Sequence, residues 1–124
     1  MIMLKRPTSE AETPQRDPLY RLGQIVRHRR YGYRGVVVDF DLTCKADAAW
    51  YQSNQTQPDR DQPWYHVLVD GSSNSTYAAQ TSLEADERSD PIVHPYLELF
   101  FMEFTGDRYV RNDRSWPSLD ETGE

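Results

Sequence analysis

The sequence predicts a mainly β domain: a small closed or half-closed barrel with one short loop helix and a short C-terminal helix. Two observations carry this prediction. Runs of β-branched and aromatic residues, clearest over residues 36–41 and 64–70, are separated by turn-forming residues. These runs predict about five strands in roughly 90 residues, which suits a small barrel better than a seven-stranded sandwich.

One domain, residues 19–110, is expected between two polar tails. The chain has 124 residues, enough for a single core. Residues 1–18 are proline-rich and without periodicity, and residues 111–124 are polar with an acidic end, so we expect both to be disordered. The single cysteine, Cys44, excludes an intrachain disulfide. With no signal peptide and no long apolar run, the sequence favours a cytoplasmic protein and no membrane partner.

The elements follow from local patterns. A first strand is expected within 20–27, and later strands at 36–41, 64–70, 76–80, 82–84 and 109–110, the 82–84 segment having a 3₁₀ turn as its alternative. Alternation along the 36–41 strand places Val36, Val38 and Phe40 on one face. Asp47 is expected to cap the loop helix over 48–52. Pro95 begins the second helix, whose apolar face is formed at i, i+3, i+4 and i+7 by Leu97, Phe100, Phe101 and Phe104. That face covers one end of the barrel or contacts a second subunit, so a homo-oligomer is one alternative.

The first two predicted strands form a hairpin, because Gly32 and Gly35 allow a tight turn between them. A local excess of positive charge marks this hairpin. Between residues 21 and 34 the chain carries five arginines and no acid, although the net charge of the protein is −6. Arginine binds phosphate through two parallel N–H donors and reads guanine in the major groove. The candidate DNA contacts are therefore Arg27, Arg29, Arg30 and Arg34. The alternative is that these arginines form ion pairs with the acids that cluster at 84–90.

Several blocks of sequence resemble a known family. The blocks GQIVRHRRYGYRGVVVD (23–39), DQPWYHVLVDG (61–71) and TYAAQ (76–80) are similar to the heat-shock protein HspQ, or YccV-like, hemimethylated-DNA-binding family. His94 and Pro95, followed by GDRYV (106–110), extend the resemblance to about residues 20–110. The segments around 41–46 and 109–112 look closer to free-standing and fused YccV-like domains than to the heat-shock protein.

The resemblance implies an SH3-like barrel without enzyme activity. It implies binding to hemimethylated double-stranded DNA and a link to the control of replication initiation. The alternative function that it implies is a heat-shock or stress-response adaptor that regulates proteolysis through protein contacts. The partners would then be the initiator DnaA, whose turnover it affects, and an ATP-dependent protease, Lon, which it enhances.

The residues offer little evidence for metal binding or catalysis. His28, His66 and His94 lack the short paired spacings of a metal site, so no metal or cofactor is expected. No residues form a recognisable catalytic constellation, so no catalytic residue is expected either. Aromatic residues near the arginines offer two alternatives, packing in the core or a binding surface formed by Tyr31, Tyr33 and Tyr65.

Overall fold

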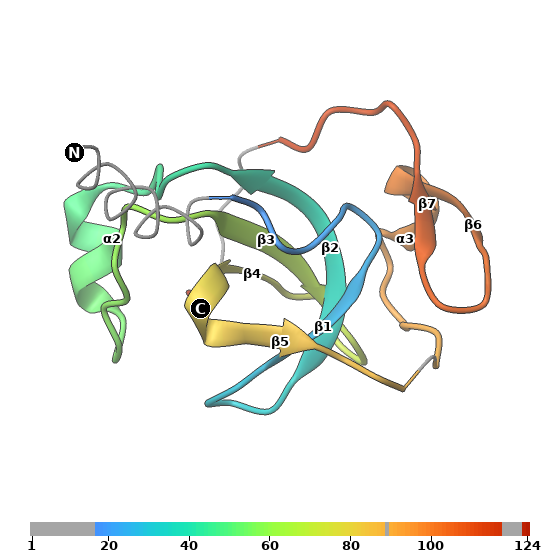
Figure 1. Ribbon diagram of the computed structural model, residues 1–124. Coiled ribbons are helices and arrows are strands. Elements are labelled where there is room, and N and C mark those ends of the chain that lie inside the picture. The colour runs from blue at the N-terminus through green and yellow to red at the C-terminus, as the bar shows by residue number, and fades with distance from the viewer. Residues whose placement is uncertain (1–16, 89, 118–122) are drawn as a thin grey trace, which may run out of the picture.

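The computed structural model describes residues 17–88, 90–117 and 123–124, and its centre is a curved five-stranded antiparallel sheet (Figure 1). The strands lie in the order β4-β3-β2-β1-β5. Their bounds are β1 (Ile25–His28), β2 (Arg34–Asp41), β3 (Trp64–Val69), β4 (Ser75–Ala79) and β5 (Leu83–Ala85). The mainly β prediction is confirmed. Among the described residues β4 and β5 end the sheet without pairing to each other, so the closed barrel stays a prediction.

Strand β5 returns across the chain to pair with β1. The pairing is antiparallel, with Arg27 opposite Glu84 and Val26 opposite Ala85. Strand β1 is therefore held between β2 and the acid-bearing strand. This topology brings the late acids of the sequence beside its early arginines.

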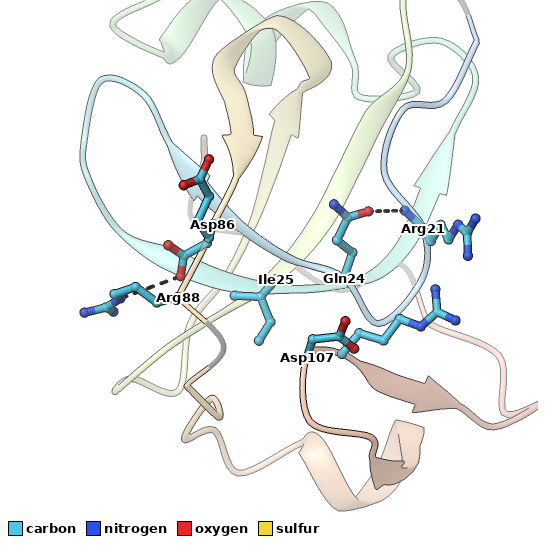
Figure 2. A pocket seen from close by; sticks show the side chains of 8 residues that line it. Arg21, Gln24, Ile25, Asp86, Arg88 and Asp107 are labelled. Atoms are coloured by element: carbon cyan, nitrogen blue, oxygen red, sulfur yellow. Dashed lines mark hydrogen bonds and ion pairs between the residues drawn. The ribbon is translucent and has the colours of Figure 1, made fainter.

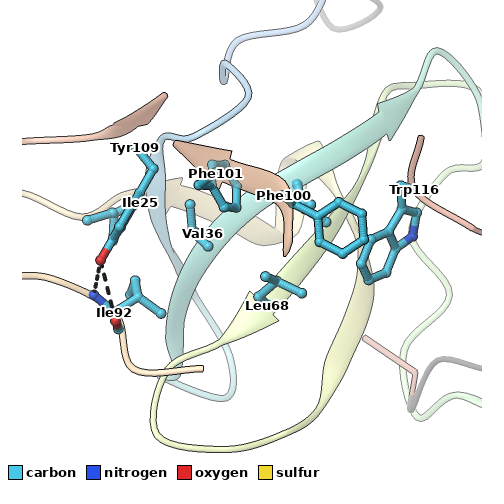
Figure 3. Close-up of a cluster of buried hydrophobic side chains, with 9 residues drawn as sticks. Ile25, Val36, Leu68, Ile92, Phe100, Phe101, Tyr109 and Trp116 are labelled. Atoms are coloured by element: carbon cyan, nitrogen blue, oxygen red, sulfur yellow. Dashed lines mark hydrogen bonds between the residues drawn. The ribbon is translucent and has the colours of Figure 1, made fainter. Parts of the chain in front are cut away.

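Strand β2 is buried on both faces, which explains its run of three valines. Val36, Val37 and Val38 are all fully buried. Val36 and Val38 face one cluster with Ile25, Leu68, Ile92, Phe100, Phe101, Tyr109 and Trp116 (Figure 3). Val37 faces a second cluster with Val26, Tyr65, Val67, Ala78 and Leu83.

The predicted face of Val36, Val38 and Phe40 is wrong at its last member. The pairing of β2 with β3 shifts register between Val37 and Asp39. A bulge of this kind breaks the strict alternation of side chains. Phe40 therefore packs with the cluster of Val37 and Tyr65.

The C-terminal helix is shorter than predicted. Helix α3 (Leu97–Phe100) makes one turn, and strand β6 (Phe101–Phe104) follows directly and pairs with β7 (Tyr109–Arg111). Phe101 and Phe104 both pack against Tyr109, at ring-centroid distances of 5.5 and 4.6 Å. The i, i+3, i+4, i+7 pattern was therefore produced by a helical turn that continues as a hairpin strand.

Two short helices complete the fold. Helix α2 (Ala48–Ser53) begins as predicted, because the Oδ1 atom of Asp47 accepts the N–H of Trp50 at 2.8 Å. The 3₁₀ helix η3 (Gln80–Ser82) precedes β5, so the segment predicted as either strand or 3₁₀ turn contains both. No helix in residues 17–88, 90–117 and 123–124 is long and apolar enough to cross a membrane.

The described residues after position 110 pack against the rest of the fold. Arg111 belongs to β7, and Trp116 is buried against Phe100 with ring centroids 5.1 Å apart. Glu124 is also buried. The predicted N-terminal tail lies outside the described residues up to position 16. Aromatic packing thus continues past residue 110, and the predicted domain boundaries stay a prediction.

Candidate nucleic-acid interface

The tip of the β1–β2 hairpin is organised by His28. Its main chain closes the turn, accepting the N–H of Gly32 at 2.9 Å and donating to the carbonyl of Tyr33 at 2.8 Å. Its Nδ1 atom accepts the N–H groups of Arg30 and Tyr31 at 3.2 and 3.1 Å. The three residues 29–31 are exposed at this turn, and we call them the hairpin tip.

Arg29 and Arg30 differ in their partners. The Nη1 atom of Arg29 lies 3.3 Å from Glu84, and its Nε donates to the carbonyl of Leu83 at 3.0 Å. The Arg30 guanidinium lies 5.7 Å from the centre of the Tyr31 ring. Among the described residues no carboxylate forms an ion pair with Arg30. The hairpin tip therefore presents one unneutralised cation and one that is paired at the surface.

Arg34 is a buried structural cation at the base of the same hairpin. Its guanidinium donates to Asp86 at 2.6 Å, to Asp70 at 3.0 Å and to the carbonyl of Asp90 at 2.6 Å. Burial lowers the pKa of Arg34, but the hydrogen bonds and charges of Asp86 and Asp70 outweigh it and leave the pKa raised. This geometry favours a structural role over the predicted DNA contact.

Arg27 is both partly paired and partly exposed. Its Nη2 atom lies 4.0 Å from Asp86, and its Nη1 atom donates to the carbonyl of Gly32 at 3.3 Å. The side chain remains 38% exposed. Ion pairing with the late acids, which was the alternative reading of the basic run, therefore occurs at Arg27, Arg29 and Arg34.

The predicted aromatic surface loses one of its three members. Tyr65 is fully buried in the core, so it cannot contact a ligand at the surface. Tyr33 is largely buried, and its hydroxyl group lies 2.7 Å from Thr76 Oγ1. Tyr31 is 44% exposed and stacks on His28 with a centroid distance of 4.7 Å. Exposed aromatic surface at the hairpin tip is thus provided by Tyr31.

A hollow of about 420 Å³ lies near the start of β1 (Figure 2). Its lining carries three arginines and three acids, with Gln24 and Ile25 between them: Arg21, Arg88, Arg108, Asp86, Glu87 and Asp107. Opposite charges in equal number give the hollow no preference for an anion. The hairpin tip, by contrast, carries the Arg30 cation without a carboxylate partner among the described residues, which complements an anion better than the hollow does.

One buried carboxylate behind the hairpin has no signal in the sequence. An Oε atom of Glu124 lies 3.9 Å from the Nε2 atom of His28, and both side chains are 2% exposed. The two residues are far apart in the chain, and Glu124 belongs to a segment whose composition predicts disorder. Only the tertiary fold brings them together.

The chain matches one known protein family over most of its length. Residues 18–108 match the family described as "Hemimethylated DNA-binding protein YccV like". The chain belongs to this family. The matched residues include all five strands of the central sheet and the whole β1–β2 hairpin.

Curated relatives carry the YccV-like region within much longer chains. The chain is 36% identical over 105 residues to the F-box only protein 21 of Mus musculus, Pongo abelii and Homo sapiens. Each alignment covers 82% of this chain and 17% of the relative. The similarity is thus to one region of those proteins.

Proposed function

We propose that this YccV-like domain is a non-catalytic module that binds double-stranded DNA through its hairpin tip. The observation that carries the proposal is Arg30, which is exposed and without a carboxylate partner among the described residues. Arg29 lies beside it and is 58% exposed, and Tyr31 adds exposed ring surface. Arginine can bind phosphate at this site and stack on a base.

The charge distribution sets the expected strength of binding. The protein carries −6 overall, and Glu84 neutralises part of the charge of Arg29. Few phosphate contacts therefore contribute, and affinity is modest and salt-dependent. Arg27 adds a third, partly paired cation, whereas Arg34 supports the hairpin from within the fold.

The proposal has two more specific parts. One is a preference for hemimethylated duplex, and the other is a role in replication initiation in the cytoplasm. The family's description supports the preference for hemimethylated DNA. A methyl group on a base edge is read through apolar contact, which the exposed Tyr31 ring can supply. The link to replication rests on the family resemblance alone.

The alternative function is an adaptor that regulates proteolysis, with the initiator DnaA or an ATP-dependent protease as partner. One observation favours protein contacts: strand β4, at the edge of the sheet, donates a main-chain hydrogen bond to residue 123. Edge strands bind extended segments of other proteins in this way. A pull-down with and without nuclease separates the two functions, because an adaptor keeps its partner after the nucleic acid is digested.

Fluorescence anisotropy tests the DNA proposal directly. The wild type and the Arg29→Ala/Arg30→Ala double variant are titrated with unmethylated, hemimethylated and fully methylated forms of one duplex. We expect the double variant to bind about tenfold more weakly and to lower the salt slope by about two. The wild type should bind the hemimethylated form most tightly.

The Arg108→Ala variant is the matched control, because it removes a cation from the exposed β6–β7 turn. It should bind DNA like the wild type. Equal affinity of the wild type and the double variant would refute the interface. Equal affinity for the three duplexes would refute only the methylation preference.

A further inference from the structure

The edge of β4 holds a two-residue segment from the far end of the sequence. The N–H of Tyr77 donates to the carbonyl of Gly123 at 2.9 Å. The N–H of Ala79, two residues further along the same edge, donates to the Oε2 atom of Glu124 at 3.2 Å. In a strand, residues two apart present their N–H groups on the same side. The segment thus occupies the donors that an added strand would use.

Side chains complete a closed seat for the Glu124 carboxylate. Thr56 donates its hydroxyl hydrogen to Oε1 at 2.7 Å. Burial raises the pKa of Glu124, but its contacts with His28, Ser82, Thr56 and the Ala79 N–H outweigh it and leave the pKa lowered. The seat therefore favours an ionised carboxylate.

The tautomer of His28 places a buried N–H donor beside the Glu124 carboxylate. Its Nδ1 atom accepts two main-chain N–H groups, so the neutral ring carries its proton on Nε2. This Nε2 atom is buried and without a hydrogen bond, and it lies 3.9 Å from the Oε2 atom of Glu124. A buried N–H donor without an acceptor costs free energy. A carboxylate in the seat offsets part of this cost by attracting the N–H group electrostatically.

Main-chain contacts identify the occupant as a polypeptide. Asn54 accepts the N–H of Glu124 on its Oδ1 atom at 3.2 Å, and Tyr33 donates its hydroxyl hydrogen to the Glu124 carbonyl at 3.3 Å. Together with the bond from Tyr77, these contacts engage the C=O and the N–H of the Gly123–Glu124 peptide group and the main-chain oxygen of Glu124. A phosphate group or a free carboxylate has no such peptide group.

The position before the acid is selective for glycine. Gly123 has φ of +104°, a conformation that L residues with a side chain rarely adopt. A Cβ atom there would lie 2.7 Å from Asn54 Oδ1. The seat thus combines a glycine requirement with a carboxylate requirement.

We propose that this seat, formed by the β4 edge with His28, Tyr33, Asn54 and Thr56, binds an extended Gly-Glu segment of a partner protein. In the structure the chain's own Gly123–Glu124 segment occupies it and competes with that partner. This function goes beyond DNA binding at the hairpin tip. It adds a second recognition surface on the other side of His28 and requires no nucleic acid.

A peptide titration of the full chain tests the proposal. The probe is a fluorescein-labelled, C-terminally amidated pentapeptide, Ser-Thr-Gly-Glu-Ser, and the proteins are the wild type and Glu124→Ala. Because the tethered segment competes in the wild type, we expect Glu124→Ala to bind the probe about tenfold more tightly. Replacing Glu by Gln, or Gly by Val, in the probe should weaken binding to this variant about tenfold.

A second substitution locates the site. Adding Thr56→Val to Glu124→Ala removes one carboxylate donor from a loop and should weaken probe binding about fivefold or more. Urea unfolding of each variant verifies that the fold is retained. No binding to Glu124→Ala at millimolar probe, or equal binding of the Glu and Gln probes, would overturn the proposal. Equal binding to the wild type and Glu124→Ala would overturn the competition by the chain's own segment.

Discussion

The base and the tip of the β1–β2 hairpin carry arginines four positions apart with opposite roles. At the base, Arg34 is 8% exposed and is held by Asp70, Asp86 and the main chain of Asp90. At the tip, Arg30 is exposed and contacts the ring of Tyr31. The same residue type is a structural cation at one end and a candidate ligand contact at the other.

This difference arises from what the fold places opposite each position. Strand β5 and the loop after it bring Asp86 and Asp90 to the base of the hairpin, whereas the last residue pair of β1 with β5, His28 with Leu83, precedes the tip. A basic run in a sequence is therefore not yet a basic surface. The role of each cation depends on the partners that the fold places around it.

The largest effect is expected from removing the buried cation. Arg34→Ala leaves Asp86, whose side chain is 4% exposed, without its main partner. Breaking a buried pair from one side typically costs about 3–5 kcal/mol in the free energy of unfolding. Urea denaturation should show this loss, whereas Arg30→Ala should stay within about 0.5 kcal/mol of the wild type. Similar losses for the two variants would contradict the assignment of roles.

Substitution of the two hairpin glycines should likewise cost more stability in the strand than at the turn. A Cβ atom on Gly35, in β2, would lie 2.4 Å from the Leu68 carbonyl oxygen and 2.5 Å from Val67 Cγ1. Gly35→Ala should therefore cost about 3 kcal/mol of stability through overpacking. Gly32, at the turn, has φ of +78° and open space around it, so Gly32→Ala should cost about 1 kcal/mol. Thermal unfolding of the pair measures the difference, and the reverse order would be inconsistent with this packing.

The smallest effect is expected at the paired cation of the tip. Glu84→Gln releases Arg29 from an exposed ion pair, whose strength is about 0.5 kcal/mol. DNA affinity should rise about twofold at low salt, and the free energy of unfolding should stay unchanged. Glu103→Gln, on the exposed face of β6, makes the same charge change away from the tip and serves as the control. Equal affinity gains in both variants would indicate a general charge effect in place of a local one.

Local chemistry made much of the fold predictable. The β-branched run of β2, the Asp47 cap of α2 and the position of β3 were all visible in the sequence. The run from Leu97 to Phe104 was misjudged because one helical turn followed by a strand imitates helical spacing over eight residues. Phe40 was misplaced because a bulge leaves no mark in the residue pattern.

The candidate sites were less predictable than the fold. The basic run and the acids at 84–90 were both evident, but their pairing depended on the return of β5 beside β1. For Tyr65 the sequence left core packing and a binding surface open, and the structure buries it completely. The Glu124 seat had no sequence signal, because its donors come from β1, the turn that follows it, the loop after α2, and β4.

The sequence by itself determined the β class, the hairpin and the presence of a concentrated positive charge, because strand propensity, turn chemistry and charge are local properties. Only the tertiary structure decided which charges face solvent and which are neutralised. That choice depends on contacts between residues tens of positions apart, such as Arg34 with Asp86 and His28 with Glu124. Burial and pairing energies act across such contacts, and no window of sequence contains both partners.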